Sequence, residues 1–279
     1  MDKVKILVAC HKPAKVYSDN VYTPIHVGRA VSKCTDKMQD MIGDDTGDNI
    51  SAKNPFYSEL TAQYWLWKNV HDVEYVGLCH YRRYFKHLIT EENVDGLLGN
   101  KNQVYLMKPT MIPYSIADHL MIWNSREDFY IFLCCFKKVH PESYHQLLVF
   151  LNRNKFSAAN MFVVKKNLFD EFAKWQFSIL FEMEKYVKLA PYSRQRRIYG
   201  YFAEILFSFY AEINHLKVKY DHSSDWPGRP SWQDFNLKTF YNTSRQALAF
   251  FITHIRKKEY TFDSDSVRIG LKNDGINLE

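Results

Sequence analysis

The sequence predicts an α/β protein with a single, mainly parallel sheet flanked by helices, and two patterns lead to this prediction. Short all-apolar runs recur along the chain, at Ile6–Cys10, Tyr75–Cys79 and Val104–Met107. Such runs are typical of strands that are buried on both faces of a parallel sheet. Longer amphipathic segments separate these runs, and the alternation of strand and helix favours a parallel sheet.

The remaining elements follow from the same periodicities. Two further strands are expected, at Asn160–Val164 and Leu216–Tyr220. Asn54 is a suitable N-cap and Pro55 suits the first helical position, so a helix is expected to begin there and to end at Asn69. Residues 13–43 show no clear periodicity. The other expected helices cover 116–153, 168–188, Ile198–Ile213 and 236–258.

Length and composition favour one large domain with an appendage. The chain has 279 residues, of which 46% are hydrophobic, so it can bury a sizeable core. Pro227, Gly228 and Pro230 mark a change of character after the last expected strand. We therefore expect a main domain at 1–220 and a helical C-terminal appendage at 221–279.

Charge and cysteine usage restrict the partners and the compartment. The net charge of +6 suits an anionic partner, but no run of five basic residues is present, and nucleic acid is not expected. The five cysteines are irregularly spaced and form no CxxC pair, which argues against disulfides and a zinc site. No segment has about 18 consecutive apolar residues. These features indicate a cytoplasmic protein.

Polar side chains gather where the expected strands end. In open α/β sheets, ligands bind at the carboxyl ends of the strands. Cations and carboxylates together suit a nucleotide-sugar donor, because the leaving diphosphate needs charge neutralisation and the acceptor hydroxyl needs a base. The expected donor-binding residues are His11, Lys12, Asp44, Asp45, Asp48, Asn49, His80, Arg82, Arg83 and Arg196.

Arginine is a suitable partner for the diphosphate, because its planar fork binds two oxygens and stays charged. In an extended segment Arg82 and Arg83 would point to opposite faces, so one of them would face the site and the other would be structural. Asp44 and Asp45 suit either a turn or a Mg²⁺ or Mn²⁺ site. No DxD sequence follows an apolar strand. A site without metal or other cofactor is therefore favoured.

Several long motifs resemble the DUF4422 family of bacterial proteins. They occur at Asp44–Ser51, Asn54–Pro55, Glu59–Ala62, Gly77–Phe85, Asn160–Phe162 and Gln195–Glu204. Members of this family are regarded as glycosyltransferases of capsule, exopolysaccharide or O-antigen synthesis, and some resemble galactofuranosyltransferases. The resemblance implies a GT-A-like nucleotide-binding fold in which residues 80–83 take the place of the usual DxD. It also implies that Asn160 and Met161 border the acceptor.

A single displacement with inversion requires a carboxylate that deprotonates the acceptor. Glu204 is the first candidate, because it is a lone carboxylate on an apolar and aromatic helix face. A structural role as an ion-pair partner of Arg196 or Arg197 remains equally open for it. Asp118 is the second candidate.

The expected activity is transfer of galactofuranose or another hexose from a UDP-linked donor to a lipid-linked oligosaccharide. The basic tail, with Arg245 and Arg256–Lys258, suits a peripheral contact with an anionic membrane or a solvated helix face. Two other functions remain open. One is a non-catalytic sugar- or nucleotide-binding partner in a polysaccharide assembly complex. The other is a phosphotransferase, which the missing phosphate loop disfavours.

Overall fold

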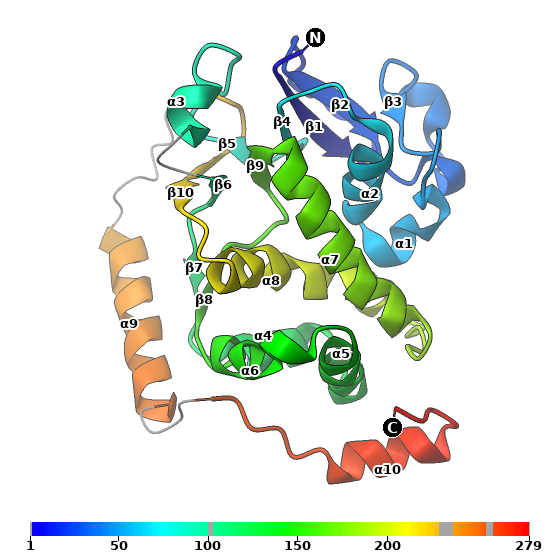
Figure 1. Cartoon of the computed structure of the whole chain (residues 1–279), viewed down its shortest axis with the longest axis vertical. Coiled ribbons are helices and arrows are strands. Elements are labelled where there is room, and N and C mark those ends of the chain that lie inside the picture. The colour runs from blue at the N-terminus through cyan, green and yellow to red at the C-terminus, as the bar shows by residue number, and fades with distance from the viewer. Residues whose placement is uncertain (1, 100–102, 229–236, 255–258, 279) are drawn as a thin grey trace.

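A seven-stranded sheet forms the centre of the protein (Figure 1). The structure is a computed structural model that describes residues 2–99, 103–228, 237–254 and 259–278. The order of the strands is β10-β6-β9-β4-β1-β2-β3. Their bounds are β1 Val4–Cys10, β2 Tyr22–His26, β3 Ile42–Gly43, β4 Tyr75–His80, β6 Val104–Met107, β9 Phe162–Lys165 and β10 Val218–Asp221. Two short pairs lie beside it, β5 (Tyr84–Phe85) with β11 (Ser223–Ser224), and β7 (Thr110–Met111) with β8 (Lys155–Phe156).

The expected mainly parallel sheet is confirmed, with one antiparallel strand. β1 runs parallel to β2 and β4, and β10 runs parallel to β6. β9 lies between β4 and β6 and is antiparallel to both. An apolar run carries no information about strand direction, so the sequence could not reveal this reversal. As a result, the chain enters β9 at the edge of the sheet where β1 and β4 end.

Two strands lie in the segment that shows no periodicity. β2 and β3 extend the sheet beyond β1. β2 contains Pro24 and partly exposed positions. β3 has only two residues. Neither strand has the continuous apolar run that marks β1 and β4, which explains why the sequence pattern missed them.

Ten α-helices are present among the described residues. The expected helical segments appear as α4 Ile116–Trp123, α5 Arg126–Val139, α6 Tyr144–Leu151, α7 Lys166–Glu184, α8 Ile198–Ile213 and α9 Leu237–His254. The helix expected up to Asn69 is instead broken into α1 (Asn54–Tyr57) and α2 (Leu60–Asn69). The break falls at Ser58, whose φ is 54°. The short helices α3 (Val94–Leu98) and α10 (Asp265–Asn273) were not expected.

Asn54 is not the helix cap that the sequence suggests. It is the first residue of α1, and Lys53 occupies the N-cap position without a side-chain hydrogen bond. The Asn54 side-chain amide instead donates to the Ser58 carbonyl at 2.7 Å and to the Thr61 hydroxyl at 3.1 Å. Asn54 therefore stabilises the break between α1 and α2.

The two faces of the sheet pack into separate parts of the core. Alternate residues of β1 face opposite sides, as a strand requires. Leu7 and its face pack with side chains of α2, α5, α7 and α8. Ile6 and Val8, on the other face, pack with Tyr84, Phe85 and α3.

The C-terminal segment is partly joined to the main body. β10 pairs with β6 and crosses the expected boundary at residue 220. On α10, Val267 and Leu271 are buried in the same core as α5. The division at 220 therefore stays a prediction. The helix expected at 236–258 is present as α9, and Arg256–Lys258 lie outside the described residues.

Candidate active site

The segment after β4 forms a tight turn. The amides of His80 and Arg83 each donate to the other's carbonyl, at 3.0 Å. The extended conformation considered for this segment is therefore wrong. Both arginine side chains are exposed, and the Arg82 guanidinium lies 4.8 Å from the centroid of the Tyr81 ring. Both cations are thus available to a ligand at this edge of the sheet.

The ends of β1 and β4 meet at this turn. The ring of His11 contacts Tyr81 edge-on, with centroids 5.5 Å apart, and the Tyr81 amide donates to the Ala9 carbonyl. Burial of the His11 ring lowers its pKa, and the charges of Lys12 and Arg82 lower it further. The structure therefore brings together the predicted donor-binding residues of the two strand ends.

The chain that leads into β9 lies opposite His80. The His80 Nε2 and the Ala159 carbonyl oxygen are 2.6 Å apart. Ala159 and Asn160 both have positive φ, 75° and 49°. This conformation is uncommon outside glycine and often marks functional sites. Met161 is only 2% exposed and packs in the core.

Asn160 connects this segment to a carboxylate that the sequence did not single out. The Asn160 side-chain amide donates to Glu59 Oε1 at 2.7 Å, and both residues are 9% exposed. Glu59 lies directly after the break at Ser58, at the N-cap position of α2. A carboxylate at the start of a helix is stabilised by the helix dipole, which is sufficient to explain a glutamate at this position. Only the fold shows that Glu59 also contacts Asn160.

Arg197 is the second residue that the sequence did not place in the site. Its Nε donates to the Ser58 hydroxyl at 2.9 Å, and its Nη2 lies 3.9 Å from Glu59 Oε2. The predicted donor-binding residue Arg196 has a different environment, because its Nε donates to the Ala190 carbonyl at 2.8 Å. In a run of neighbouring arginines the sequence could not tell which one faces the site.

Glu204 lies half-buried on α8 and interacts with several of these residues. Burial, assisted by the charge of Glu59, raises the pKa of its carboxyl to about 7, although Arg197, Arg83 and a backbone hydrogen bond from Ala159 act in the opposite direction. A carboxyl with such a pKa can accept a proton near neutral pH. Its environment therefore suits the base that the sequence predicts.

The second candidate base, Asp118, caps α4. Its carboxylate accepts from the Ser115 hydroxyl at 2.5 Å and from the Ser115 amide at 3.4 Å, while its own amide donates to that hydroxyl. Asp118 also lies beside Tyr260 of the C-terminal segment, where it helps to raise the pKa of the tyrosine. Of the two carboxylates, Glu204 is the one that responds to Arg83, Arg197 and Glu59.

In the acidic loop after β3, Asp44 and Asp45 form hydrogen bonds and an ion pair with neighbouring residues. Asp44 is fully buried and accepts from the amides of Gly28 (2.7 Å) and Arg29 (3.1 Å) and from the Ser51 hydroxyl. Asp45 forms an ion pair with Arg29 at 2.9 Å. These contacts fix the chain that leaves β2, so Asp44 and Asp45 have structural partners. Their donor-binding role stays a prediction.

Asp48 and Asn49 also make local hydrogen bonds. Asp48 accepts from the Tyr64 hydroxyl at 3.0 Å. The Asn49 side chain donates to the Gly47 carbonyl at 2.9 Å and accepts from the Ser51 amide at 3.2 Å. This loop lies two strands from β1, at the same edge of the sheet, and a contact with a nucleotide stays a prediction for both residues. Among the described residues, no three His, Cys, Asp or Glu side chains gather as a metal site would require.

Comparisons with known proteins place this chain in a family. Residues 5–215 match the domain of unknown function DUF4422, and the chain belongs to that family. In the apo structure of the bifunctional glycosyltransferase WbbM, a region 30% identical in sequence has a similar fold, with a TM-score of 0.67. The match covers 80% of this chain and 45% of that chain, so the matched region is less than half of the WbbM chain. No curated protein matched the sequence significantly.

Proposed function

We propose that this chain is a glycosyltransferase that uses a nucleotide-diphosphate sugar. The observation that carries the proposal is a carboxyl with a pKa of about 7, on Glu204, which interacts electrostatically with Arg83 after β4 and with Arg197 before α8. A base and a diphosphate site are the two elements that glycosyl transfer needs in one place. The similarity to a bifunctional glycosyltransferase supports the same activity.

The proposed reaction is one displacement at the anomeric carbon. Glu204 accepts the proton of the acceptor hydroxyl, whose oxygen forms the new bond to that carbon. The bond from the carbon to the diphosphate oxygen breaks, and the nucleoside diphosphate leaves with the electron pair. Arg82, Arg83 and Arg197 neutralise the charge that develops on it. Attack from the face opposite the leaving group inverts the anomeric configuration.

The proposed donor is a UDP-sugar carrying galactofuranose or another hexose. A thermal-shift screen of nucleotide sugars, with EDTA and with Mn²⁺, tests the donor and the need for metal. We expect a stabilising shift with UDP-sugars that persists in EDTA, since the arginines would hold the diphosphate. Slow release of free sugar from the same donor by wild type, but not by Glu204→Gln, would separate an enzyme from a non-catalytic binding protein. Stable donor in both samples would refute the enzymatic function.

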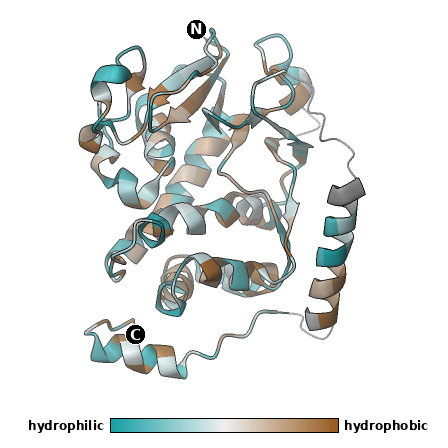
Figure 2. Ribbon diagram, turned by 180° about the vertical axis from the view of Figure 1, so that it is seen from behind, coloured by the Kyte–Doolittle hydropathy of each residue, from teal (hydrophilic) through white to brown (hydrophobic). Residues whose placement is uncertain are grey.

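We also propose that the acceptor is a lipid-linked oligosaccharide of surface-polysaccharide synthesis and that α9 contacts the cytoplasmic face of the membrane. Four exposed apolar residues, Tyr241, Leu248, Phe251 and Ile252, lie on one side of α9, with Arg245 among them. In Figure 2 the C-terminal part of α9, which contains Leu248, Phe251 and Ile252, is coloured mainly as hydrophobic. An amphipathic helix of this kind suits the surface of an anionic bilayer. Within the described residues, the helices are too short or too polar to cross one.

Flotation with vesicles that contain anionic phospholipid tests this contact. The triple variant Leu248→Ser, Phe251→Ser and Ile252→Ser should stay in the protein fraction while wild type floats. Ile269→Ser on α10 is the matched control, because Ile269 is also exposed and apolar. Equal flotation of wild type and the triple variant would remove α9 from the membrane contact.

A further inference from the structure

α8 carries one continuous stripe of accessible side chains. Arg197, directly before the helix, is followed at intervals of three or four residues by Tyr201, Glu204, Ser208 and Glu212. Such intervals place side chains on one face of a helix. From Ile198 to Ala211 every residue between the stripe positions is buried. The stripe is therefore the only face of this part of α8 that a ligand could reach.

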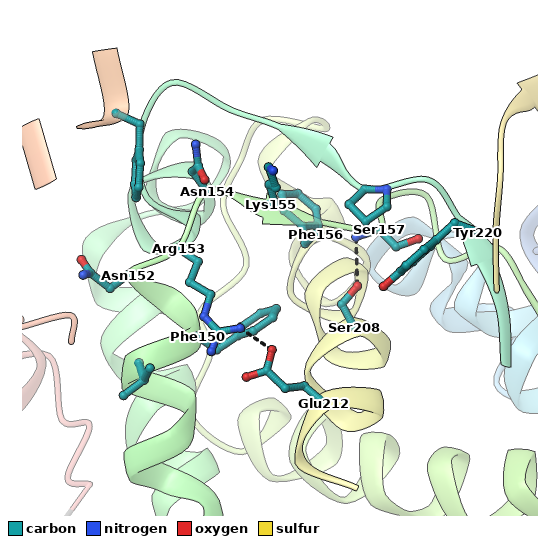
Figure 3. A pocket seen from close by; sticks show the side chains of 13 residues that line it. Phe150, Asn152, Arg153, Asn154, Lys155, Phe156, Ser157, Ser208, Glu212 and Tyr220 are labelled. Atoms are coloured by element: carbon teal, nitrogen blue, oxygen red, sulfur yellow. Dashed lines mark hydrogen bonds and ion pairs between the residues drawn. The ribbon is translucent and has the colours of Figure 1, made fainter. Parts of the chain in front are cut away.

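The far end of the stripe lies in a pocket. Ser208 and Glu212 line a cavity of about 540 Å³, together with residues of α6, β8, β10 and α9 (Figure 3). This volume falls within the range of about 300–1,000 Å³ that is typical of small-molecule sites. At a rise of about 1.5 Å per residue, Ser208 lies about 6 Å beyond Glu204 along the helix axis. That distance is close to the length of one hexose residue.

We propose that this pocket binds a neutral sugar of the acceptor saccharide, next to the sugar whose hydroxyl reacts at Glu204. The proposal rests on the proposed glycosyltransferase function and adds a second sugar subsite to it. A saccharide presents apolar ring faces and many hydroxyls, so its site must combine aromatic surface with hydrogen-bonding groups.

The pocket offers both kinds of group. Tyr220 is 50% exposed, and in Figure 3 its ring lies across the pocket with its hydroxyl directed toward Ser208. Arg153 and Glu212 form an ion pair on another side of the pocket. This pair compensates both charges, so Lys155 is the only other charged side chain of the described lining, and its ammonium can donate to sugar hydroxyls. The amide of Ser157 donates to the Ser208 hydroxyl at 2.9 Å, which fixes the position of this hydroxyl in the pocket lining.

The pocket wall combines the family domain with the C-terminal segment. Arg153, Ser208 and Glu212 lie within the residues that match the family. Tyr220 and Phe250, which also line the pocket, lie beyond them. The catalytic residues can therefore be shared across the family, while the C-terminal segment selects the acceptor of this particular protein.

Direct binding of small saccharides to the full chain tests the proposal without any transfer reaction. The probes are methyl β-D-galactofuranoside, methyl β-D-galactopyranoside and lactose. Saturation-transfer NMR measures the binding of each probe to the protein. We expect binding of at least one probe to wild type and to Glu204→Gln. Tyr220→Ala should weaken it by about tenfold or more, which corresponds to about 1.4 kcal/mol. Tyr241→Ala is the matched control, because Tyr241 is an exposed tyrosine of α9 outside the pocket lining.

Each outcome decides between the possibilities. Equal binding by wild type and Tyr220→Ala, or no binding of any probe, would overturn the pocket assignment. Binding that is lost in Tyr220→Ala, in a protein that neither hydrolyses nor transfers any donor sugar, would refute the proposed function and support the pocket as a saccharide site. In an active enzyme, Tyr220→Ala should raise the acceptor KM.

Discussion

Replacement of Glu204 by Gln removes the charge of a half-buried carboxylate and keeps the size of the side chain. Burial and Glu59 raise the pKa of this carboxyl from its ordinary value of 4.5 to about 7. In the unfolded chain the carboxyl ionises near its ordinary pKa, whereas in the folded protein it ionises only near 7. As the pH rises from about 4 to about 8, the free energy of unfolding therefore falls by about 3 kcal/mol relative to that of a protein with an uncharged side chain at this position.

Urea unfolding across this pH range measures the effect. Glu204→Gln should match wild type near pH 4 and become more stable by about 2–3 kcal/mol near pH 8, with a melting temperature higher by several degrees. Glu171→Gln provides the control, because Glu171 is an exposed carboxylate on α7. The Gln variant should also lose transfer. An equal pH dependence of stability in wild type and Glu204→Gln would refute the assigned environment, and transfer at the wild-type rate would refute the role as base.

Three further predictions concern the site and the sheet. The rate of transfer should rise with pH through about 7 as Glu204 loses its proton, and a rate that falls over this range would exclude a carboxylate base there. Arg197→Gln should weaken UDP binding in a calorimetric titration by about tenfold or more, whereas Arg196→Gln, whose side chain bonds Ala190, should leave the Kd almost unchanged. A Cβ at Gly77 would lie 2.8 Å from the Phe162 carbonyl oxygen, so Gly77→Ala should lower the free energy of unfolding in urea by about 2 kcal/mol or more. Gly96 lies in open space on α3, and as a control Gly96→Ala should raise this free energy by about 0.5–1 kcal/mol.

Patterns that repeat along the chain could be predicted. β6 and α8 have the bounds expected from the sequence, and β1 and β4 differ by one or two residues. These elements are apolar on every buried face, so composition alone identifies them. β2 has no such pattern because it contains Pro24 and is only partly buried, and its pairing with β1 depends on the whole sheet.

Candidate site residues could be predicted when they lie at the end of a buried strand. Residues that join the candidate site only through long-range contacts were missed. His11 follows β1, His80 ends β4, and Arg82 and Arg83 follow it, so these residues lie at one edge of the sheet, while their donor-binding role stays a prediction. Glu59 was missed because its partner Asn160 lies about a hundred residues away in sequence and approaches only when β9 inserts beside β4. The positive φ of Ser58 also could not be predicted, because serine rarely adopts this conformation.

The reversed strand β9 has a consequence for how this chain could be divided or assembled. It lies between β4, which belongs to the first half of the chain, and β6, and Asn160 at its entrance holds Glu59 of the first half. A fragment that ends before residue 160 would contain His11, Glu59 and His80. In it, β4 would have an unpaired edge, and the candidate base Glu204 would be absent. Co-expression of residues 1–153 and 154–279 as separate chains should therefore restore the proposed activity, because the second fragment supplies β9 and Glu204. The two halves would then act as a conditional enzyme whose activity reports their association.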